Sequence, residues 1–190
     1  MNIAATPFHK IAVIGLGLIG GSLCHAIRRA FPNLALIGVD QPEVIDLART
    51  SLDHVFLPDE LEIALRGADV VFMATPINAI IEYLPRVAAC TERDTLVSDV
   101  GSTKAEIVAA ARRVMAGRGC FIGGHPLAGK EHAGWQHSDA GLFKNATYVL
   151  TPDLPVPEKI KTDFVALLQK FGARVIEREA ATHDRVVAEV

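Results

Sequence analysis

Short apolar runs alternate along the chain with longer stretches whose apolar residues recur at helical spacing. Runs of strand length predict strands at 11–14, 34–39, 70–73, 95–98, 120–122, 148–150 and 174–176. After the first run, helical spacing predicts a helix with one buried face, formed by Ile19, Leu23, Ile27 and Ala30. Strands that are apolar throughout and separated by helices are typical of a parallel sheet covered on both faces. The pattern therefore predicts an α/β fold with a doubly wound, mostly parallel sheet and helices on both of its faces.

Start and stop residues define further helices. Helices are predicted at 42–50, at 59–66 and at 158–171, and Gly172 is expected to end the last of these. Thr75 is predicted to cap another helix, whose first residue would be Pro76. The segment 51–58 is weakly patterned, and no strand is predicted there.

A capping box is predicted in front of one more helix. Thr103 and Glu106 have the required spacing, and the helix would run through Met115. From residue 179 the chain is predicted to be helical again, without a stop signal before its end. In that last helix the preceding residues would poorly cover Ala181, Val186, Val187 and Val190. We therefore expect one domain at 1–178, and at 179–190 the start of a second, helical domain that is truncated.

A glycine-rich turn follows the first predicted strand. Residues 15–20, Gly-Leu-Gly-Leu-Ile-Gly, match the pattern G-x-G-x-x-G between a strand and a helix. Gly15 would make the tight turn, Gly17 would admit a pyrophosphate, and Gly20 would let the helix pack closely on the strand. The start of the helix would offer free N–H groups and a positive dipole end to the phosphates, at Leu18 and Ile19. These features predict a Rossmann-type dinucleotide-binding domain and not merely a turn.

Asp40 closes the second predicted strand, twenty positions after Gly20. A carboxylate at this place accepts hydrogen bonds from the adenosine ribose hydroxyls and repels a 2′-phosphate. The following residues offer no arginine that would hold such a phosphate. The sequence therefore favours NAD over NADP as the cofactor. A role for Asp40 as a helix cap is the alternative, and it is compatible with ribose binding.

The stretch 11–27 carries no charge and lies between Lys10 and the pair Arg28-Arg29. Such a stretch also resembles a signal-peptide core or a short membrane span. Four glycines interrupt it, which favours the dinucleotide-binding turn, and its flanks lack a cleavage-site pattern. We therefore expect a cytoplasmic protein without a membrane segment.

Composition narrows the expected partners. The net charge is -3 and basic residues form no run, which argues against a nucleic-acid surface. The three cysteines lie far apart, which fits neither a disulfide framework nor a zinc site. We therefore expect a small-molecule substrate and no metal.

The reacting end of a ligand is expected beyond the carboxyl ends of the strands. The segments predicted to lie there are Thr75 with Pro76, residues 99–104 and residues 123–134. The last of them carries two histidines, a lysine, a glutamate and four glycines. Pro126 favours an extended conformation for His125. Gly123 and Gly124 would let a ligand approach the backbone.

At these residues the chain resembles the prephenate dehydrogenases, together with the arogenate and cyclohexadienyl dehydrogenases. The resemblance covers nearly the whole chain. Its main motifs are Gly-Leu-Gly-Leu-Ile-Gly-Gly-Ser-Leu at 15–23, Asp-x-Gly-Ser-x-Lys at 99–104 and Gly-x-His-Pro-x-Ala-Gly-x-Glu-x-x-Gly at 123–134. Shorter matches include His183-Asp184. Many dehydrogenases share the first motif, whereas the second and third together are much more specific.

The resemblance implies oxidative decarboxylation of prephenate or arogenate. NAD+ takes hydride from the ring carbon that bears the hydroxyl, a base takes the hydroxyl proton, and carbon dioxide leaves as the ring becomes aromatic. His125 matches the histidine that bonds the substrate hydroxyl, and a reference pKa near 6.5 suits it to that proton. Ser102 would support His125, and the pocket would be lined by Gly124, Lys104 and Glu131. Alternatively, Ser102 caps a helix, and Lys104 and Glu131 are solvated loop residues.

In the family, a helical second domain supplies the dimer interface and an arginine that grips the substrate carboxylate. The resemblance therefore implies a homodimer formed through a C-terminal domain. Two other functions stay open. One is a two-domain dehydrogenase of the 3-hydroxyacid or 6-phosphogluconate type, which predicts a catalytic lysine in a helix. The other is a sensor that binds NAD(H) without turnover.

Overall fold

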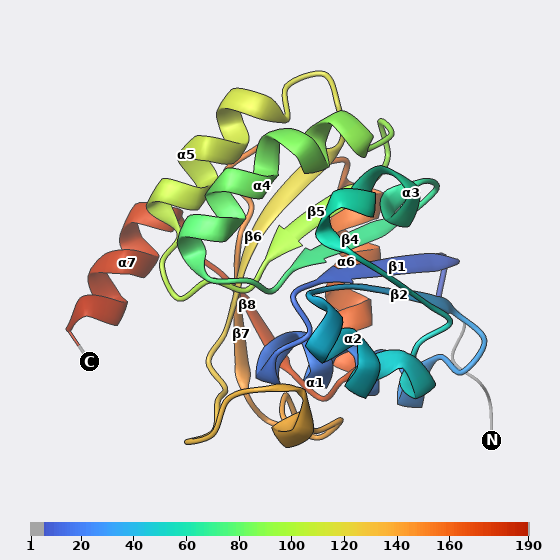
Figure 1. Ribbon diagram of the computed structural model, residues 1–190. Coiled ribbons are helices and arrows are strands. Elements are labelled where there is room, and N and C mark those ends of the chain that lie inside the picture. Colours follow the sequence, from blue (N-terminus) through green and yellow to red (C-terminus); the bar gives the residue numbers. More distant parts are fainter. Residues whose placement is uncertain (1–5, 190) are drawn as a thin grey trace.

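The computed structural model describes residues 6–189, which form an eight-stranded sheet with helices on both faces (Figure 1). In sheet order the strands are β3 (His54–Phe56), β2 (Ala35–Val39), β1 (Lys10–Ile14), β4 (Val70–Met73), β5 (Leu96–Asp99), β6 (Cys120–Pro126), β7 (Thr147–Thr151) and β8 (Arg174–Glu177). Strands β1 to β6 are parallel, β7 is antiparallel to β6, and β8 is parallel to β7. The strand order reverses between β1 and β4, and such switch points are where doubly wound sheets bind ligands. The predicted fold class is confirmed.

Two hydrophobic cores lie on opposite faces of the sheet, because successive strand residues point to opposite sides. In β1, for example, Ile11 and Val13 belong to one core, whereas Ala12 and Ile14 belong to the other. The first core is covered by α1 (Leu18–Ala30) and α6 (Glu158–Lys170). The second is covered by α3 (Leu61–Leu65), α4 (Ile77–Cys90) and α5 (Ala105–Val114).

The remaining helices are short. They are α2 (Pro42–Ala48), α7 (Ala180–Ala188) and single 3₁₀ turns at Arg49–Ser51, Pro58–Glu60 and Trp135–His137. None of the helices within residues 6–189 is both long and apolar enough to span a membrane. The uncharged stretch 11–27 instead forms β1, the glycine turn and most of α1.

Two strands depart from the prediction. Strand β3 lies at the edge of the sheet inside the weakly patterned segment 51–58, and its His54 is exposed. Strand β6 continues to Pro126 instead of ending at residue 122, because its last four residues pair with β7. His125 therefore lies on a strand opposite Val149, and not on the loop that the sequence predicts. Strand pairing fixes its backbone more firmly than a loop would.

Both predicted threonine caps are wrong. Helix α4 begins at Ile77, after Pro76, and no side chain caps it. Helix α5 begins at Ala105, and its first N–H groups are bound by a residue of α7. Asp184 Oδ1 accepts a hydrogen bond from the Lys104 N–H at 2.7 Å, and its Oδ2 accepts one from the Ala105 N–H at 2.8 Å. A carboxylate is a better partner than a threonine hydroxyl for the positive end of a helix dipole.

Helix α7 packs against α5 at the carboxyl edge of the sheet (Figure 1). Its buried residues are Ala180 and His183. As predicted, Ala181 and Val186 are exposed, and Val187 is half-buried. Val190, which was also predicted to be uncovered, lies outside the described residues.

Candidate functional site

The glycine turn joins β1 to α1 with the geometry that its sequence predicts. Gly15 has a φ of +90°, a conformation that glycine adopts without strain. A Cβ on Gly20 would overlap the carbonyl oxygen of Gly15, so only glycine allows α1 to begin this close to the turn. At Gly17 the situation is the opposite, because no atom lies within 4 Å of the place that a Cβ would take. The turn is therefore tight on its inner side and open at Gly17.

The N-terminus of α1 is free to bind an anion. Gly17 is its N-cap residue and makes no side-chain capping bond, and the first turn holds no acidic residue. The first backbone bond of the helix runs from the Gly21 N–H to the Gly17 carbonyl. Within the described residues, the preceding N–H groups of Leu18 and Ile19 have no partner. Free N–H groups beside an open backbone fit the pyrophosphate of a dinucleotide.

Asp40 follows β2 and faces the glycine turn. Its Oδ2 accepts a hydrogen bond from the Leu16 N–H at 2.5 Å, and its Oδ1 accepts one from the Gln41 N–H at 2.7 Å. It does not cap α2, whose N-cap residue is Gln41. The carboxylate thus holds the turn in place, and each oxygen retains a lone pair for a ribose hydroxyl.

A buried ion pair lies at the carboxyl ends of β5 and β6. The side chains of Asp99 and Lys104 are both 0% exposed, and Lys104 Nζ bonds Asp99 Oδ2. Lys104 Nζ also donates to the Gly124 carbonyl at 2.7 Å, and Asp99 accepts bonds from the Gly101 and Gly124 N–H groups. Burial lowers the pKa of Lys104 and raises that of Asp99. Lys104 is therefore not a solvated loop residue, and the pair ties the start of α5 to the strand that carries His125.

The two glycines before His125 serve packing instead of the predicted approach of a ligand. A Cβ on Gly123 would overlap Thr151 Oγ1. A Cβ on Gly124 would lie 2.6 Å from the Asp99 carbonyl oxygen and 3.0 Å from the ring of Tyr148. Protein atoms already fill the space that was expected to be open.

His125 is half-buried and contacts a second histidine. Its Nδ1 lies 3.0 Å from Nε2 of His183, and Nδ1 of His183 lies 2.7 Å from Asp184 Oδ1. Within the described residues, Nε2 of His125 has no hydrogen-bond partner. Burial, and after it the proximity of His183 and Lys104, lowers the pKa of His125 from 6.5 to about 4. The ring is therefore neutral near pH 7.

Sequence comparison identifies the family. Residues 23–177 match the family described as prephenate dehydrogenase, nucleotide-binding domain. The chain belongs to this family. The resemblance carried by the three motifs is thereby confirmed.

Individual relatives agree with this assignment. The prephenate dehydrogenase of Lactococcus lactis is 37% identical over 185 residues, which are 95% of this chain and 49% of that protein. Synechocystis arogenate dehydrogenase has a similar structure, with a TM-score of 0.85 and 34% identity over 94% of this chain and 63% of that one. The prephenate dehydrogenase from A. aeolicus, in complex with hydroxyphenyl propionate and NAD+, has a TM-score of 0.87 and 25% identity, covering 96% of this chain and 64% of that one. The chain spans about half the length of the Lactococcus lactis protein and of the prephenate dehydrogenase of Bacillus subtilis, which it also matches.

The other predicted site residues of this family member differ in their surroundings. Ser102 is exposed between β5 and α5, and Glu131 is exposed in the segment after β6. No hydrogen bond within the described residues joins either side chain to His125. Thr75 follows β4, and its hydroxyl is buried without a partner in the same part of the chain. The roles of Ser102, Glu131, Thr75 and Pro76 therefore stay predictions.

The contributions of Asp99, His183 and Asp184 to the site were not predicted from the sequence. Asp99 and the pair His183-Asp184 stand inside motifs of the prephenate dehydrogenase resemblance, so the signal was present. No local pattern assigns them a partner, because those partners are distant in sequence. His183 is 58 positions from His125, and Asp184 is 80 positions from Lys104.

The segment after His125 is fastened to the nucleotide-binding helix. Gly21 leaves room for it, since a Cβ there would lie 2.8 Å from Ser138 Cβ and 2.9 Å from Trp135. The Asp139 N–H donates to Ser22 Oγ at 2.9 Å. Gly21 and Ser22 of α1 are thus in direct contact with the segment that follows His125. These contacts connect the predicted pyrophosphate-binding region with the predicted proton-transfer region.

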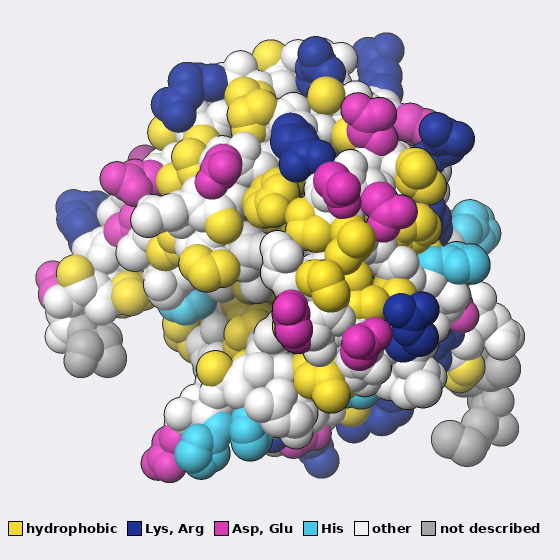
Figure 2. All heavy atoms as spheres, viewed as in Figure 1, with side chains coloured by type: hydrophobic (Ala, Val, Ile, Leu, Met, Phe, Trp, Pro, Cys, Tyr) yellow, Lys and Arg dark blue, Asp and Glu magenta, His cyan; other side chains and the backbone are white. Residues whose placement is uncertain are grey.

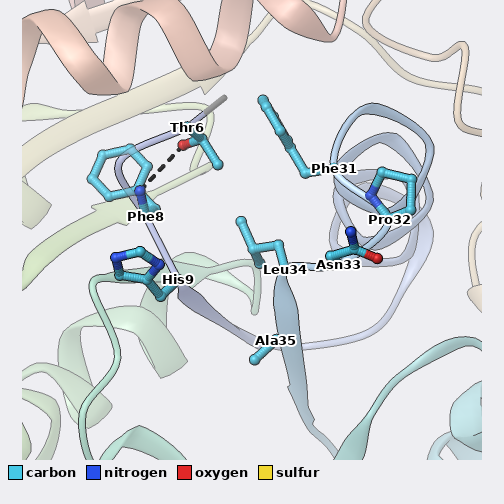
Figure 3. Close-up of a pocket in the computed structure, with 8 residues that line it drawn as sticks. All are labelled: Thr6, Phe8, His9, Phe31, Pro32, Asn33, Leu34 and Ala35. Carbon is cyan, nitrogen blue, oxygen red and sulfur yellow. Dashed lines mark hydrogen bonds between the residues drawn. The ribbon is translucent and has the colours of Figure 1, made fainter. Parts of the chain in front are cut away.

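One pocket of this domain lies apart from the glycine turn and His125. A pocket at the opposite end of the sheet, near the first residues of β1 and β2, is lined by Thr6, Phe8, His9, Phe31, Pro32, Asn33, Leu34 and Ala35 (Figure 3). It lies away from the carboxyl edge that holds the glycine turn and His125. On the face shown in Figure 2, Lys and Arg side chains are scattered among Asp and Glu and do not gather into one basic area.

The lowered pKa of His125 predicts an acid-dependent loss of stability. The unfolded chain takes up this proton near pH 6.5, and the folded chain takes it up only near pH 4. The contribution to stability is therefore complete above pH 6.5 and is lost as the pH falls towards 4. Urea unfolding at one pH above 6.5 and at another between 4 and 6.5 measures this change in the free energy of unfolding. His125→Asn should flatten this slope, whereas His132→Asn, at an exposed histidine, should not. Equal slopes in wild type and His125→Asn would contradict the assignment.

Proposed function

We propose that this domain binds NAD and supplies the proton acceptor of an NAD-dependent dehydrogenase that acts on prephenate or arogenate. The observation that carries the proposal is a neutral His125, held at the same sheet edge as the glycine turn, whose Nε2 has no hydrogen-bond partner in the described part of the chain. The relatives support the substrate class, because their names state prephenate and arogenate dehydrogenases. One of the similar structures was solved with NAD+ and hydroxyphenyl propionate.

Each part of the site has a distinct task. The N–H groups of Leu18 and Ile19 and the open backbone at Gly17 bind the pyrophosphate, and Asp40 binds the adenosine ribose. When bound, NAD+ accepts hydride from the ring carbon that bears the hydroxyl. His125 Nε2 accepts the hydroxyl proton as the hydride departs. The bond between the ring and the carboxylate then breaks, and carbon dioxide leaves. The electron pair of that bond completes the aromatic ring, and the phenolic oxygen takes the proton back from His125.

The protein's share of this reaction is small but specific. Aromatisation supplies the driving force, so the site needs only to orient the groups and to move one proton. Ser102 and Glu131, which are exposed, are proposed to support His125 or to line the substrate pocket. Gly124 and Lys104, which are buried, are proposed to hold the strand that carries His125. A substrate-binding arginine, homodimer assembly through a helical domain and a cytoplasmic location stay predictions from the resemblance.

Calorimetric titration of this chain with NAD and with NADP tests the cofactor assignment. We expect NAD to bind more tightly, because the carboxylate of Asp40 repels a 2′-phosphate. Asp40→Ala should weaken NAD binding by about 10- to 100-fold, the usual worth of hydrogen bonds to a charged group, and should narrow the gap to NADP.

Two further variants control this measurement. Asp40→Asn removes the charge and keeps one acceptor oxygen, which can retain the bond from the Leu16 N–H of the turn while the bond from the Gln41 N–H is lost. It should therefore reduce the preference for NAD over NADP. Glu43→Ala removes an exposed carboxylate from the nearby α2 and should change neither affinity. Tighter binding of NADP than of NAD by the wild-type chain would overturn the assignment.

A further inference from the structure

We propose that His183 and Asp184 are positioning residues that fix the tautomer of His125 and so make its Nε2 a proton acceptor. This inference rests on the proposed function and adds to it a device that acts through His125. Neither residue needs to touch substrate or cofactor. Three side chains are linked in sequence, from the Asp184 carboxylate through His183 to His125.

Asp184 is held rigidly where α7 meets α5. Its two oxygens accept the Lys104 and Ala105 N–H groups, so the carboxylate cannot rotate without losing both bonds. Burial opposes ionisation, but the bonds from Ala105, His183 and Lys104 outweigh it and lower the pKa of Asp184. The group is therefore an ionised carboxylate that can only accept hydrogen bonds.

An acceptor at this place determines which nitrogen of His183 carries the proton. Nδ1 of His183 lies 2.7 Å from Asp184 Oδ1, so it must donate. In a neutral ring, Nε2 then presents its lone pair. His183 is 3% exposed, so water does not compete freely for that nitrogen.

The same logic carries over to His125. Its Nδ1 lies 3.0 Å from Nε2 of His183. Because that Nε2 presents a lone pair, Nδ1 of His125 must carry the proton. Nε2 of His125 is left with a lone pair and no partner within the described residues. That is the state that a base needs before it takes the substrate's hydroxyl proton.

The opposite tautomer of His183 would prevent His125 from acting as a base. A His183 with the opposite tautomer, or with both nitrogens protonated, would donate from Nε2 to Nδ1 of His125. His125 would then carry its proton on Nε2 and could not accept another there. In serine proteases, forcing the wrong tautomer on the catalytic histidine lowers turnover by about 10⁴-fold. Because Asp184 also caps α5, the packing of α7 against α5 and the tautomer of His125 depend on the same carboxylate.

Nuclear magnetic resonance of the ¹⁵N-labelled chain tests the tautomers without any turnover. Long-range proton–nitrogen correlation spectra near neutral pH distinguish a ring protonated on Nδ1 from one protonated on Nε2. Signals of the two rings are assigned from their absence in His125→Asn and in His183→Asn. We expect both rings to be protonated on Nδ1 only. A proton on Nε2 of His125 in the wild-type chain would overturn the proposal.

Kinetics of two His183 variants test the consequence in the polypeptide that the whole gene encodes. His183→Gln places an amide oxygen near the position of Nε2 and keeps an acceptor for His125. His183→Leu fills a similar volume without an acceptor. We expect His183→Leu to lower kcat by about 10- to 100-fold, as loss of an orienting partner does elsewhere, with the KM for NAD unchanged. His183→Gln should recover most of this loss.

The outcomes separate this inference from the proposed function. Equal losses in the Gln and Leu variants, or an unchanged kcat in His183→Leu, would overturn the positioning role. Urea unfolding of both variants shows whether a loss reflects folding alone, and the spectra of the Gln variant still report the tautomer of His125. If wild type turns over neither prephenate nor arogenate, the proposed function fails, and the wild-type spectra alone decide this inference.

Discussion

Replacing His125 by asparagine is expected to lower the turnover of prephenate or arogenate by about 10²- to 10⁴-fold, the usual loss when a general base is removed. The substitution is selective. An asparagine amide N–H can take the place of Nδ1 and still donate to Nε2 of His183, so the neighbouring bonds are kept. What disappears is the lone pair of Nε2. The affinity for NAD should hardly change, because no hydrogen bond within the described residues joins His125 to the glycine turn or to Asp40.

The measurement is the absorbance of reduced nicotinamide, recorded with the polypeptide of the whole gene and saturating substrate. His132→Asn, an exposed histidine seven positions along the same segment, is the matched control and should keep normal turnover. The rate of wild type should fall at acid pH as His125 becomes protonated, and the variant should lack this fall. Near-normal turnover by His125→Asn with an unchanged pH profile would show that another group takes the proton. An NAD-binding chain with no turnover in wild type would favour the sensor function instead.

Local sequence patterns were sufficient wherever the deciding contacts are local. The run 70–73 coincides with β4, and the fingerprint placed Gly15 and Gly20 correctly around the start of α1, whereas the ribose-binding role of Asp40 stays a prediction. In each case the pattern states its own physical requirement, such as a positive φ at Gly15 or the absence of a Cβ at Gly20. The same holds for Gly172, whose φ of +86° ends α6.

Patterns failed where a distant segment decides the outcome. Strand β3 has only Val55 and Phe56 as apolar residues, both half-buried, because an edge strand buries little. The extension of β6 depends on pairing with β7, about 25 residues further on, as the Gly124–Leu150 pair shows. The cap of α5 comes from Asp184 and not from Thr103, because a carboxylate from α7 reaches its first turn.

The buried pair of Asp99 and Lys104 is the part of the site on which stability should depend most. Both side chains are 0% exposed, so neither charge has water as an alternative partner. Lys104→Met removes one charge and leaves the other buried. Breaking a buried pair in this way costs about 3–5 kcal/mol, because the remaining charge is unpaired. We expect a loss of this size in the free energy of unfolding, measured by urea denaturation at neutral pH.

Two comparisons make this expectation specific. Lys130→Met removes a lysine that pairs with Asp139 at 3.3 Å, with side chains 39% and 52% exposed. Such surface pairs contribute about 1 kcal/mol or less, so this variant measures the effect of losing a lysine as such. Adding Asp99→Asn to Lys104→Met removes the orphaned charge and keeps an acceptor for one of the two N–H groups, of Gly101 and Gly124, that bond Asp99. The double variant should therefore be more stable than Lys104→Met alone, since a buried pair costs most when only one partner is removed. A loss in Lys104→Met no larger than that in Lys130→Met would show that no uncompensated charge is left at Asp99, and it would contradict this expectation.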